Sequence, residues 1–269
     1  MGHLAGETAV VTGASAGIGA AYADRLARRG ANLILAARDE RRLGELARRL
    51  MSETSVSVDI MPVDLSTDAG IGVVEKRFEE DPRITMLINN AGIAEFGPIT
   101  ECDPRRLDEM LRLNVLAVAK LARAAGRAFQ SRSRGDIVIV SSTAAISPIY
   151  KNSAYGSTKA FGLYLGTSMA GELEGTGVRV QVVLPGMTRT EIWERSGTSV
   201  ESLPQHLVMD AGDMVEASLA GLDLGELVTM PGLEDGGEWT AFEVARDKLT
   251  HRSKGHPAPR YGVGAKVTT

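Results

Sequence analysis

Tyr155, Lys159 and Ser142 are the residues whose types and spacing could carry out proton chemistry. Tyr155 and Lys159 are four positions apart in the segment Ser-Ala-Tyr-Gly-Ser-Thr-Lys, so in a helix they project from the same face. A nearby ammonium group favours the phenolate and lowers the pKa of a tyrosine from about 10 toward the pH of efficient proton exchange. Ser142 could hold a carbonyl oxygen while the phenol protonates it. The same spacing also occurs on ordinary solvated helix faces, so this pair alone does not establish a site.

A glycine-rich turn near the N-terminus predicts a phosphate-binding site. An apolar segment at residues 8–11 is followed by Thr-Gly-Ala-Ser-Ala-Gly-Ile-Gly, from Thr12 to Gly19, and then by a helical pattern to Arg29. Glycines let the backbone approach a pyrophosphate, and the N-terminus of the following helix favours its negative charge. A plain tight turn can have the same composition, but the position between strand and helix favours the phosphate site.

The next two predicted strands end in charged residues that could recognise an adenosine. Arg38 follows an apolar strand at residues 31–37, where an acidic residue would suit the ribose of NAD and an arginine the 2′-phosphate of NADP. Arg38 could equally be a solvated residue at the start of a charged helix. Asp64 follows the third strand and could meet an adenine amino group or cap the next helix.

Two polar residues fall where an open α/β sheet would use them. Asn114 lies in a mostly apolar helical pattern at residues 103–129, so it is either a structural hydrogen-bonding residue or part of a proton path. Ser142 follows the fifth strand, at residues 136–141, and the carboxyl ends of strands are where such sheets place their chemistry. The helix predicted at residues 153–172 carries Tyr155 and Lys159.

Strands and helices alternate along the chain, which predicts an α/β fold. We expect a single doubly wound Rossmann domain over residues 1–269, with a seven-stranded, mostly parallel sheet and helices on both faces. Residues 191–210 show no clean periodicity and are interpreted as a substrate lid. Residues 232–269 form a C-terminal tail rich in glycine, proline and charge, with one short helix near residues 240–249.

Composition excludes several classes of function. The net charge of −4 and an aromatic content of 4% argue against nucleic acid as a partner. The single cysteine cannot form an internal disulfide, and the four histidines show no metal-ligand spacing, so we expect no metal. The apolar runs are too short to span a bilayer and no signal sequence is evident, so we expect a cytoplasmic protein that does not use a membrane.

Taken in order, these motifs resemble the short-chain dehydrogenase/reductase (SDR) family over residues 5–230. The resemblance rests on the turn from Thr12 to Gly19, Asp64, the Asn89-Asn90-Ala91-Gly92 segment, Asn114, Ser142, Tyr155 with Lys159, and Pro185-Gly186 with Thr190.

The resemblance implies a role for each matching residue. Tyr155 would be the general acid and base, Lys159 would hold the nicotinamide ribose and lower the tyrosine pKa, Ser142 would bind the substrate oxygen, and Asn114 would anchor a water in a proton relay. The cofactor would be bound by Gly13, Ser15, Gly17, Ile18 and Gly19 at the pyrophosphate, by Asn90 and Asp64 on the adenosine side, by Arg38 at an NADP 2′-phosphate, and by Pro185, Gly186 and Thr190 at the nicotinamide. Tyr155 and Lys159 would also contact the cofactor.

Two departures from the family pattern matter. Ala16 stands where members that prefer NADP often have a second basic residue, so the preference rests on Arg38. The usual family ending after the last strand is replaced by Met-Pro-Gly-Leu, with Asp235-Gly236-Gly237 as a partial echo, so substrate analogies transfer poorly.

We therefore expect an NAD(P)H-dependent oxidoreductase that prefers NADPH and interconverts a ketone or aldehyde and an alcohol. A hydrophobic carbonyl substrate would lie among Ser142, Ala144, Ile149, Met187 and Trp193. One alternative is a 3-oxoacyl thioester reductase of lipid metabolism, and another is a catalytically silent NADP-binding regulatory protein. A homodimer or homotetramer is expected, because the family usually pairs its two long helices between subunits.

Overall fold

The computed structural model describes residues 4–148, 152–252 and 255–263. The chain forms two compact units, Met1–Pro231 and Gly232–Thr269. The first unit contains a seven-stranded sheet in the order β3-β2-β1-β4-β5-β6-β7, and every neighbouring pair of strands is parallel. The strands are β1 (Thr8–Thr12), β2 (Asn32–Ala37), β3 (Val58–Pro62), β4 (Ile84–Asn89), β5 (Gly135–Val140), β6 (Val178–Val183) and β7 (Val228–Thr229).

This sheet confirms the predicted doubly wound α/β fold. Because β1 lies between β2 and β4, the chain reverses its direction of winding there, and in sheets of this kind the ligand-binding crevice lies outside the carboxyl ends of the two strands at that point, here β1 and β4. The glycine turn follows β1 and the Asn-Asn-Ala-Gly segment begins at the end of β4, so both motifs reach this crevice.

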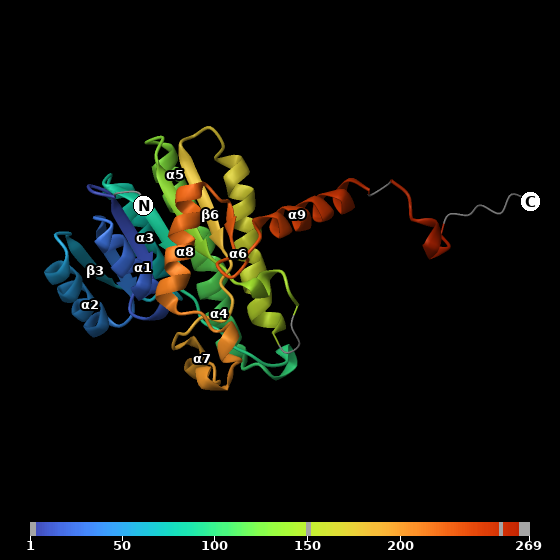
Figure 1. Ribbon diagram of the computed structural model, residues 1–269, viewed down its shortest axis with the longest axis horizontal. Coiled ribbons are helices and arrows are strands. Elements are labelled where there is room, and N and C mark those ends of the chain that lie inside the picture. Colours follow the sequence, from blue (N-terminus) through green and yellow to red (C-terminus); the bar gives the residue numbers. More distant parts are fainter. Residues whose placement is uncertain (1–3, 149–151, 253–254, 264–269) are drawn as a thin grey trace, which may run out of the picture. The chain divides into compact units, whose positions relative to one another are not determined.

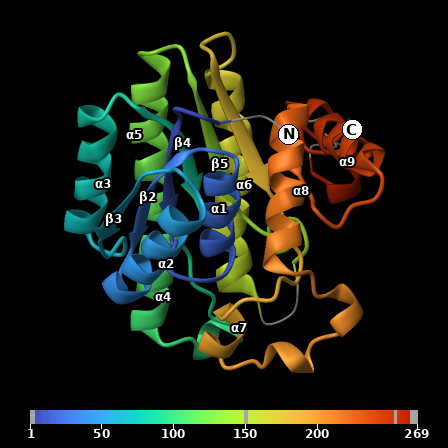
Figure 2. The same ribbon diagram turned by 60° about the vertical axis from the view of Figure 1, so that its left-hand side comes forward.

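Helices cover both faces of the sheet (Figures 1 and 2). Neighbouring residues of β1 show why: Val11 belongs to the buried cluster under one set of helices, and Val10 to the cluster under the other. The first set is α1 (Gly17–Arg28), α2 (Glu40–Glu53) and α8 (Ala211–Leu224), and the second is α3 (Asp68–Glu80), α5 (Val118–Gln130) and α6 (Ser153–Glu172).

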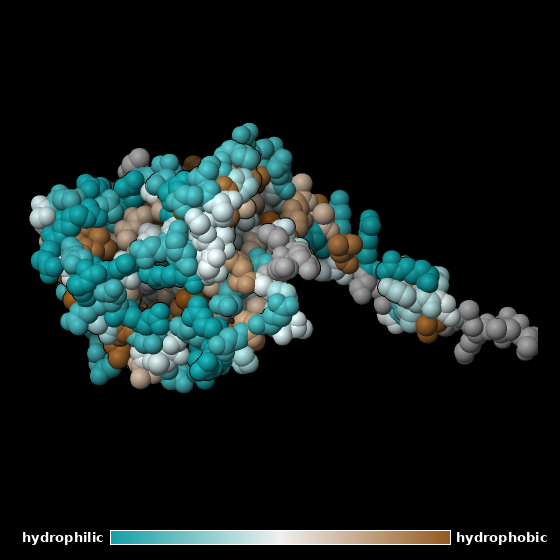
Figure 3. Space-filling view, turned by 90° about the horizontal axis from the view of Figure 1, so that it is seen from below, coloured by the Kyte–Doolittle hydropathy of each residue, from teal (hydrophilic) through white to brown (hydrophobic). Residues whose placement is uncertain are grey.

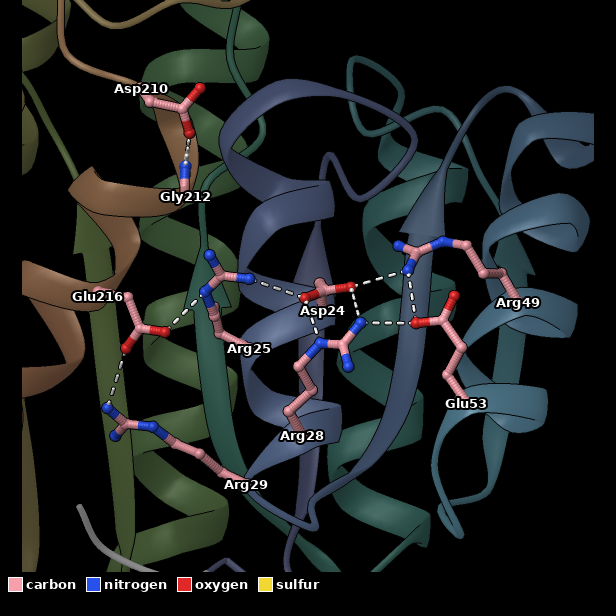
Figure 4. Close-up of polar contacts among 9 residues, drawn as sticks. All are labelled: Asp24, Arg25, Arg28, Arg29, Arg49, Glu53, Asp210, Gly212 and Glu216. Carbon is pink, nitrogen blue, oxygen red and sulfur yellow. Dashed lines mark hydrogen bonds and ion pairs between the residues drawn. The ribbon is translucent and has the colours of Figure 1, made fainter.

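An ion-pair network ties α1 to both of its neighbours (Figure 4). Asp24 of α1 accepts hydrogen bonds of 2.9 Å from Arg28 and from Arg49 of α2. Arg25 reaches across to Glu216 of α8 at 2.7 Å. Burial favours the neutral form of Asp24, but the bonds from the two arginines hold its pKa below the usual range, so the carboxylate stays charged. The helix that follows the glycine turn is therefore held from two sides.

The long helix predicted at residues 103–129 is interrupted. The structure has α4 (Pro104–Leu111), a π-helical turn at Arg112–Ala117 and then α5. A π turn widens the helix by one residue and recurs at functional sites. It contains Asn114, which is only 2% exposed.

The predicted lid is a loop whose two ends are joined. It contains α7 (Ile192–Arg195) and two short 3₁₀ turns, at Val200–Ser202 and Gln205–Leu207. Thr188 pairs with Met209 in a parallel bridge, and the Met209 N–H donates to the Met187 carbonyl at 2.9 Å. Joined ends are typical of compact functional loops.

The second unit contains α9 (Gly236–His251), which is longer than the helix predicted at residues 240–249. The Asp235 carboxylate caps this helix by accepting a 2.8 Å hydrogen bond from the Gly237 N–H. The ring centroids of Trp239 and Phe242, both on this helix, are 5.2 Å apart. The Asp-Gly-Gly segment therefore begins a helix in this chain.

Within the described residues, no helix combines the length and apolar character needed to cross a membrane. The face drawn in Figure 3 is mostly hydrophilic, with hydrophobic residues scattered over it.

Candidate active site

Tyr155 and Lys159 lie one turn apart on α6, as their spacing predicts. The Lys159 Nζ atom is 5.7 Å from the centre of the Tyr155 ring and donates a 3.0 Å hydrogen bond to the Val140 carbonyl. Lys159 is 9% exposed, whereas Tyr155 is half-buried. The last residue of β5 thus fixes the ammonium group beside the phenol.

The pKa of the phenol differs from the sequence-based prediction. Burial raises the pKa of Tyr155 to about 12, and hydrogen bonding to Ser142 acts in the opposite direction. Burial also lowers the pKa of Lys159 to about 8. The lower tyrosine pKa expected from Lys159 is not found in this chain by itself, because loss of water around the phenol is the largest influence on its pKa and the hydrogen bond with Ser142 only partly offsets it. Tyr155 keeps its proton at neutral pH, as a proton donor must.

Ser142 stands at the carboxyl end of β5 and begins a 3₁₀ turn at Thr143–Ala145. Its hydroxyl oxygen accepts from the Ala144 N–H at 3.1 Å. The Ala144 carbonyl faces the first turn of α6, where a Cβ atom on Gly156 would be 3.2 Å from it. The structure therefore brings Ser142 and Ala144 to the turn that carries Tyr155.

Asn114 lies beside Lys159 and makes three hydrogen bonds. Its amide clamps the backbone of Ile93, accepting from the N–H at 3.0 Å and donating to the carbonyl at 2.9 Å, and it donates to Thr158 Oγ1 at 3.0 Å. A Cβ atom on Gly92 would be 3.1 Å from the Asn114 oxygen and 3.5 Å from Lys159 Nζ. These contacts support a structural role for Asn114, and a role in a proton relay stays a prediction.

The glycine turn has the properties of an anion site. Helix α1 begins at Gly17, whose φ is +54°, with neither a side-chain cap nor an acidic residue in its first turn. In contrast, the side chains of the preceding residues cap α2, α3 and α8. The first-turn N–H groups of a helix have no acceptor within it, so this end suits a pyrophosphate. Ser15 and Ile18 are both partly exposed beside it.

Close packing explains the glycines on either side of this turn. A Cβ atom on Gly19 would collide with the Gly13 carbonyl, and one on Gly13 would be 2.9 Å from Asn90 Nδ2. Asn90 donates to the Thr12 carbonyl from Nδ2 and to Thr12 Oγ1 from its backbone N–H, both at 2.9 Å. Asn90 thus joins the ends of β1 and β4, and contact with adenosine stays a prediction.

The predicted adenosine end is more open. The Arg38 side chain is 58% exposed and forms a 3.2 Å ion pair with Glu109 of α4. Asp64 accepts from the Ser66 N–H at 2.9 Å, and the cap of α3 is Thr67, so the alternative that Asp64 caps that helix is wrong. Burial favours a neutral Asp64, but hydrogen bonds from Ser66 and the charge of Arg38 hold its pKa below the usual range.

The residues predicted to face the nicotinamide follow β6. The Pro185 carbonyl accepts from the Thr143 N–H at 2.9 Å, next to Ser142. Gly186 is exposed, Met187 is partly exposed, and Thr190 packs on the glycine turn, where a Cβ atom on Gly17 would be 3.1 Å from its side chain. Ile149 lies outside the described residues.

Sequence reasoning missed Phe96, which links the predicted lid to Tyr155. Its ring meets the Tyr155 ring edge to face, with 5.6 Å between centroids, and stacks on Trp193 of α7 at 5.5 Å. Trp193 is held in turn by a 2.9 Å hydrogen bond from its indole N–H to the Thr188 carbonyl. The signal was an aromatic residue just after the Asn-Asn-Ala-Gly segment.

In the part of the chain that the structure describes, no three His, Cys, Asp or Glu side chains are grouped to hold a metal ion.

Comparison with known proteins identifies the family. The model of the short chain dehydrogenase family matches residues 7–201. A short-chain dehydrogenase from Sphingobium yanoikuyae, solved in complex with NADPH, is 42% identical with a TM-score of 0.90, covering 94% of this chain and 98% of that one. The bulky-bulky ketone specific alcohol dehydrogenase from Comamonas testosteroni is 39% identical with a TM-score of 0.87, covering 95% and 98%. An uncharacterized oxidoreductase of Staphylococcus saprophyticus is 32% identical over 223 residues, which are 82% of this chain and 93% of that protein.

The family match spans both the glycine turn and the Tyr155 helix, and the solved relatives share nearly the whole chain. The chain therefore belongs to the short-chain dehydrogenase family of oxidoreductases.

Proposed function

We propose that this protein is an NADPH-preferring carbonyl reductase that acts reversibly as an alcohol dehydrogenase. The observation that carries the proposal is the convergence of four side chains from separate elements: Tyr155 and Lys159 from α6, Ser142 from the end of β5, and Asn114 from the π turn. Lys159 lies over the Tyr155 ring, Ser142 hydrogen bonds with the phenol, and Asn114 binds the α6 turn at Thr158. These contacts are buried or half-buried.

A bound nicotinamide coenzyme would supply a hydride to the carbonyl carbon. Tyr155, protonated at neutral pH, would give its proton to the carbonyl oxygen, and the Ser142 hydroxyl would donate a hydrogen bond to the same oxygen. The Lys159 charge would stabilise the phenolate left behind. Asn114 would keep the loop at Ile93 and the α6 turn at Thr158 in register. Alcohol oxidation would run these steps in reverse.

The residues of the crevice fit a dinucleotide. The uncapped start of α1 suits the pyrophosphate, with Gly13, Ser15, Gly17, Ile18 and Gly19 forming the turn. Arg38, exposed at the end of β2, would contact a 2′-phosphate. The NADPH in the Sphingobium yanoikuyae relative supports this preference. Asn90, Asp64, Pro185, Gly186 and Thr190 would complete the cofactor site.

The substrate we propose is a bulky, hydrophobic ketone. The Phe96 ring packs on Tyr155, Trp193 stacks on Phe96, and Ala144 lies beside the first turn of α6. Met187 would add further apolar surface to a substrate pocket there. The relative from Comamonas testosteroni is described as specific for bulky-bulky ketones, which favours the same class here.

The test is NADPH and NADH oxidation by the purified protein across aliphatic, aromatic, steroid and acyl-thioester ketones. We expect turnover of bulky ketones with NADPH, slower turnover with NADH, and little with small ketones. A preference for acyl thioesters would replace the substrate class proposed here, and tight NADPH binding without any turnover would favour a regulatory protein.

A further inference from the structure

A second arginine, Arg42, lies in the first turn of the helix that follows Arg38. It is the third residue of α2, and its backbone N–H donates to the Asp39 cap at 2.9 Å. Its Nε atom lies 3.5 Å from the Asp39 carboxylate, so the side chain folds back toward the start of the helix. The end of β2 and Arg38 immediately precede this turn, so the backbones of both arginines lie at the place where a 2′-phosphate is expected.

The counterion of Arg42 comes from the segment that follows β6, far away in the sequence. Arg42 Nη1 donates to both carboxylate oxygens of Glu191 at 2.9 Å. Glu191 precedes α7 and follows Thr190, which packs on the glycine turn. The ion pair therefore extends from the first turn of α2 to the base of the lid, next to the predicted pyrophosphate site.

This ion pair is charged yet accessible. The hydrogen bond and charge of Glu191 raise the pKa of Arg42, and Arg42 lowers the pKa of Glu191, so both are ionised at neutral pH. Their side chains are 35% and 48% exposed. Ion pairs at the surface contribute little to stability, so this one can be broken at little cost. Glu191 also keeps a second partner, Arg195, at 2.6 Å, so its charge stays compensated without Arg42.

We propose that Arg42 is a second recognition residue for the 2′-phosphate of NADP, and that this phosphate competes with Glu191 for the Arg42 guanidinium. The inference rests on the proposed NADP preference. A planar guanidinium that already binds a carboxylate has the donors needed for a phosphate, which carries more charge. It also supplies the second basic residue that Ala16 does not provide in the glycine turn.

The same contacts connect the coenzyme to the substrate side. Glu191 adjoins α7, whose Trp193 stacks on Phe96, which in turn packs on Tyr155. A phosphate that takes Arg42 from Glu191 removes one of the attachments of α7. The predicted lid would therefore be attached to α2 less firmly with NADP bound than with NAD bound.

The test measures binding of nucleotide fragments by calorimetry, which needs no turnover. Adenosine 2′,5′-diphosphate carries the 2′-phosphate and ADP does not. We expect Arg42→Gln to weaken 2′,5′-diphosphate binding about tenfold and to leave ADP binding unchanged. Glu191→Gln removes the competitor and should tighten 2′,5′-diphosphate binding about threefold. Arg41→Gln is the matched control, because Arg41 is the neighbouring arginine of α2 and pairs with Glu45 instead.

The outcomes separate this proposal from the proposed function. If the wild-type protein binds both nucleotides equally, the NADP preference is wrong and Arg42 has no such role. If the wild-type protein discriminates but Arg42→Gln weakens the binding of both ligands equally, or Glu191→Gln does not tighten binding of the 2′,5′-diphosphate, only the role of Arg42 is overturned.

The link to the lid is tested by proteolysis. Cleavage of residues 191–210 by a protease should be faster with the 2′,5′-diphosphate bound than with ADP bound, and equal cleavage would contradict the link.

Discussion

The two ends of the proposed cofactor site are built differently. At the Tyr155 end, Asn114 and Lys159 are at most 9% exposed and are held by hydrogen bonds to backbone carbonyls and to Thr158. At the proposed adenosine end, Arg38 is exposed and Arg42 is partly exposed, and both are held by carboxylates of other elements.

This difference separates two requirements. Proton transfer needs reacting groups whose positions are fixed within tenths of an ångström. Buried hydrogen bonds fix positions well, because breaking one leaves a buried polar group unsatisfied. A cation that recognises a phosphate has to release its carboxylate partner in the protein. A surface ion pair can be broken at little cost in stability. Substitutions at the Tyr155 end and in the glycine turn should therefore have large effects, and those among the arginines small, selective ones.

Apart from Tyr155 itself, the largest effect is expected at the glycine turn between the two ends. In Gly19→Ala the added Cβ atom collides with the Gly13 carbonyl, so the turn has to open. We expect NADPH affinity to fall by more than about 100-fold, because the backbone N–H groups lose their arrangement. Gly72→Ala on α3 is the control, since a Cβ atom there meets nothing within 4 Å. Normal NADPH affinity in Gly19→Ala would show that the turn does not bind the cofactor.

Asn114→Ala should damage the Tyr155 end next most strongly. It leaves the N–H and carbonyl of Ile93 without their partner, which costs about 2–4 kcal/mol of unfolding free energy. Turnover should fall about 100-fold, because the surroundings of Lys159 shift. Chemical denaturation and steady-state rates measure the two effects. The control is Asn32→Ala, which removes one exposed hydrogen bond that Asn32 accepts from the Ser57 N–H. An equal loss of stability in the two variants would contradict the structural role given to Asn114.

Phe96→Ala tests the Tyr155 end through the pH dependence of the reduction rate. Without this ring water reaches Tyr155, and its pKa should fall from about 12 toward the ordinary value of about 10. Reduction needs the protonated phenol, so the rate falls as pH rises through that pKa, and the fall should move to lower pH in the variant. A separate step near pH 8 from Lys159 should remain in both proteins. Phe96→Leu, which keeps an apolar cover, should shift less. An unchanged profile in Phe96→Ala would remove Phe96 from the site.

The smallest effect is expected for Arg38→Gln. It should lower the ratio of NADPH to NADH efficiency about fivefold, because one charge-assisted bond is lost while Arg42 remains. The ratio of kcat/KM values measures it, with Arg41→Gln as the control. A loss of activity with both coenzymes would mean that Arg38 has a structural role through Glu109.

The sequence was sufficient for the features that depend on local pattern. Alternating strands and helices predicted the sheet, and the spacing of Tyr155 and Lys159 predicted their common face on α6. The glycine turn was placed correctly between β1 and α1, since strand, turn and helix are adjacent along the chain.

Features that depend on distant contacts could not be predicted. The stacking of Phe96 on Trp193 joins residues almost a hundred positions apart, and the pairing of Arg42 with Glu191 joins an even wider separation. The direction of the Tyr155 pKa shift depends on burial, which the i,i+4 spacing does not reveal. The π turn at Asn114 has the same apolar pattern as an ordinary helix.

The most direct test compares turnover and coenzyme affinity in Tyr155→Phe. The account predicts that ketone reduction falls about 1,000-fold, because the proton donor is lost, while NADPH affinity is unchanged, because the adenosine end and the glycine turn remain intact. Retained turnover in this variant, or a parallel loss of NADPH affinity, would contradict the claim that chemistry and coenzyme recognition reside at separate ends of the crevice.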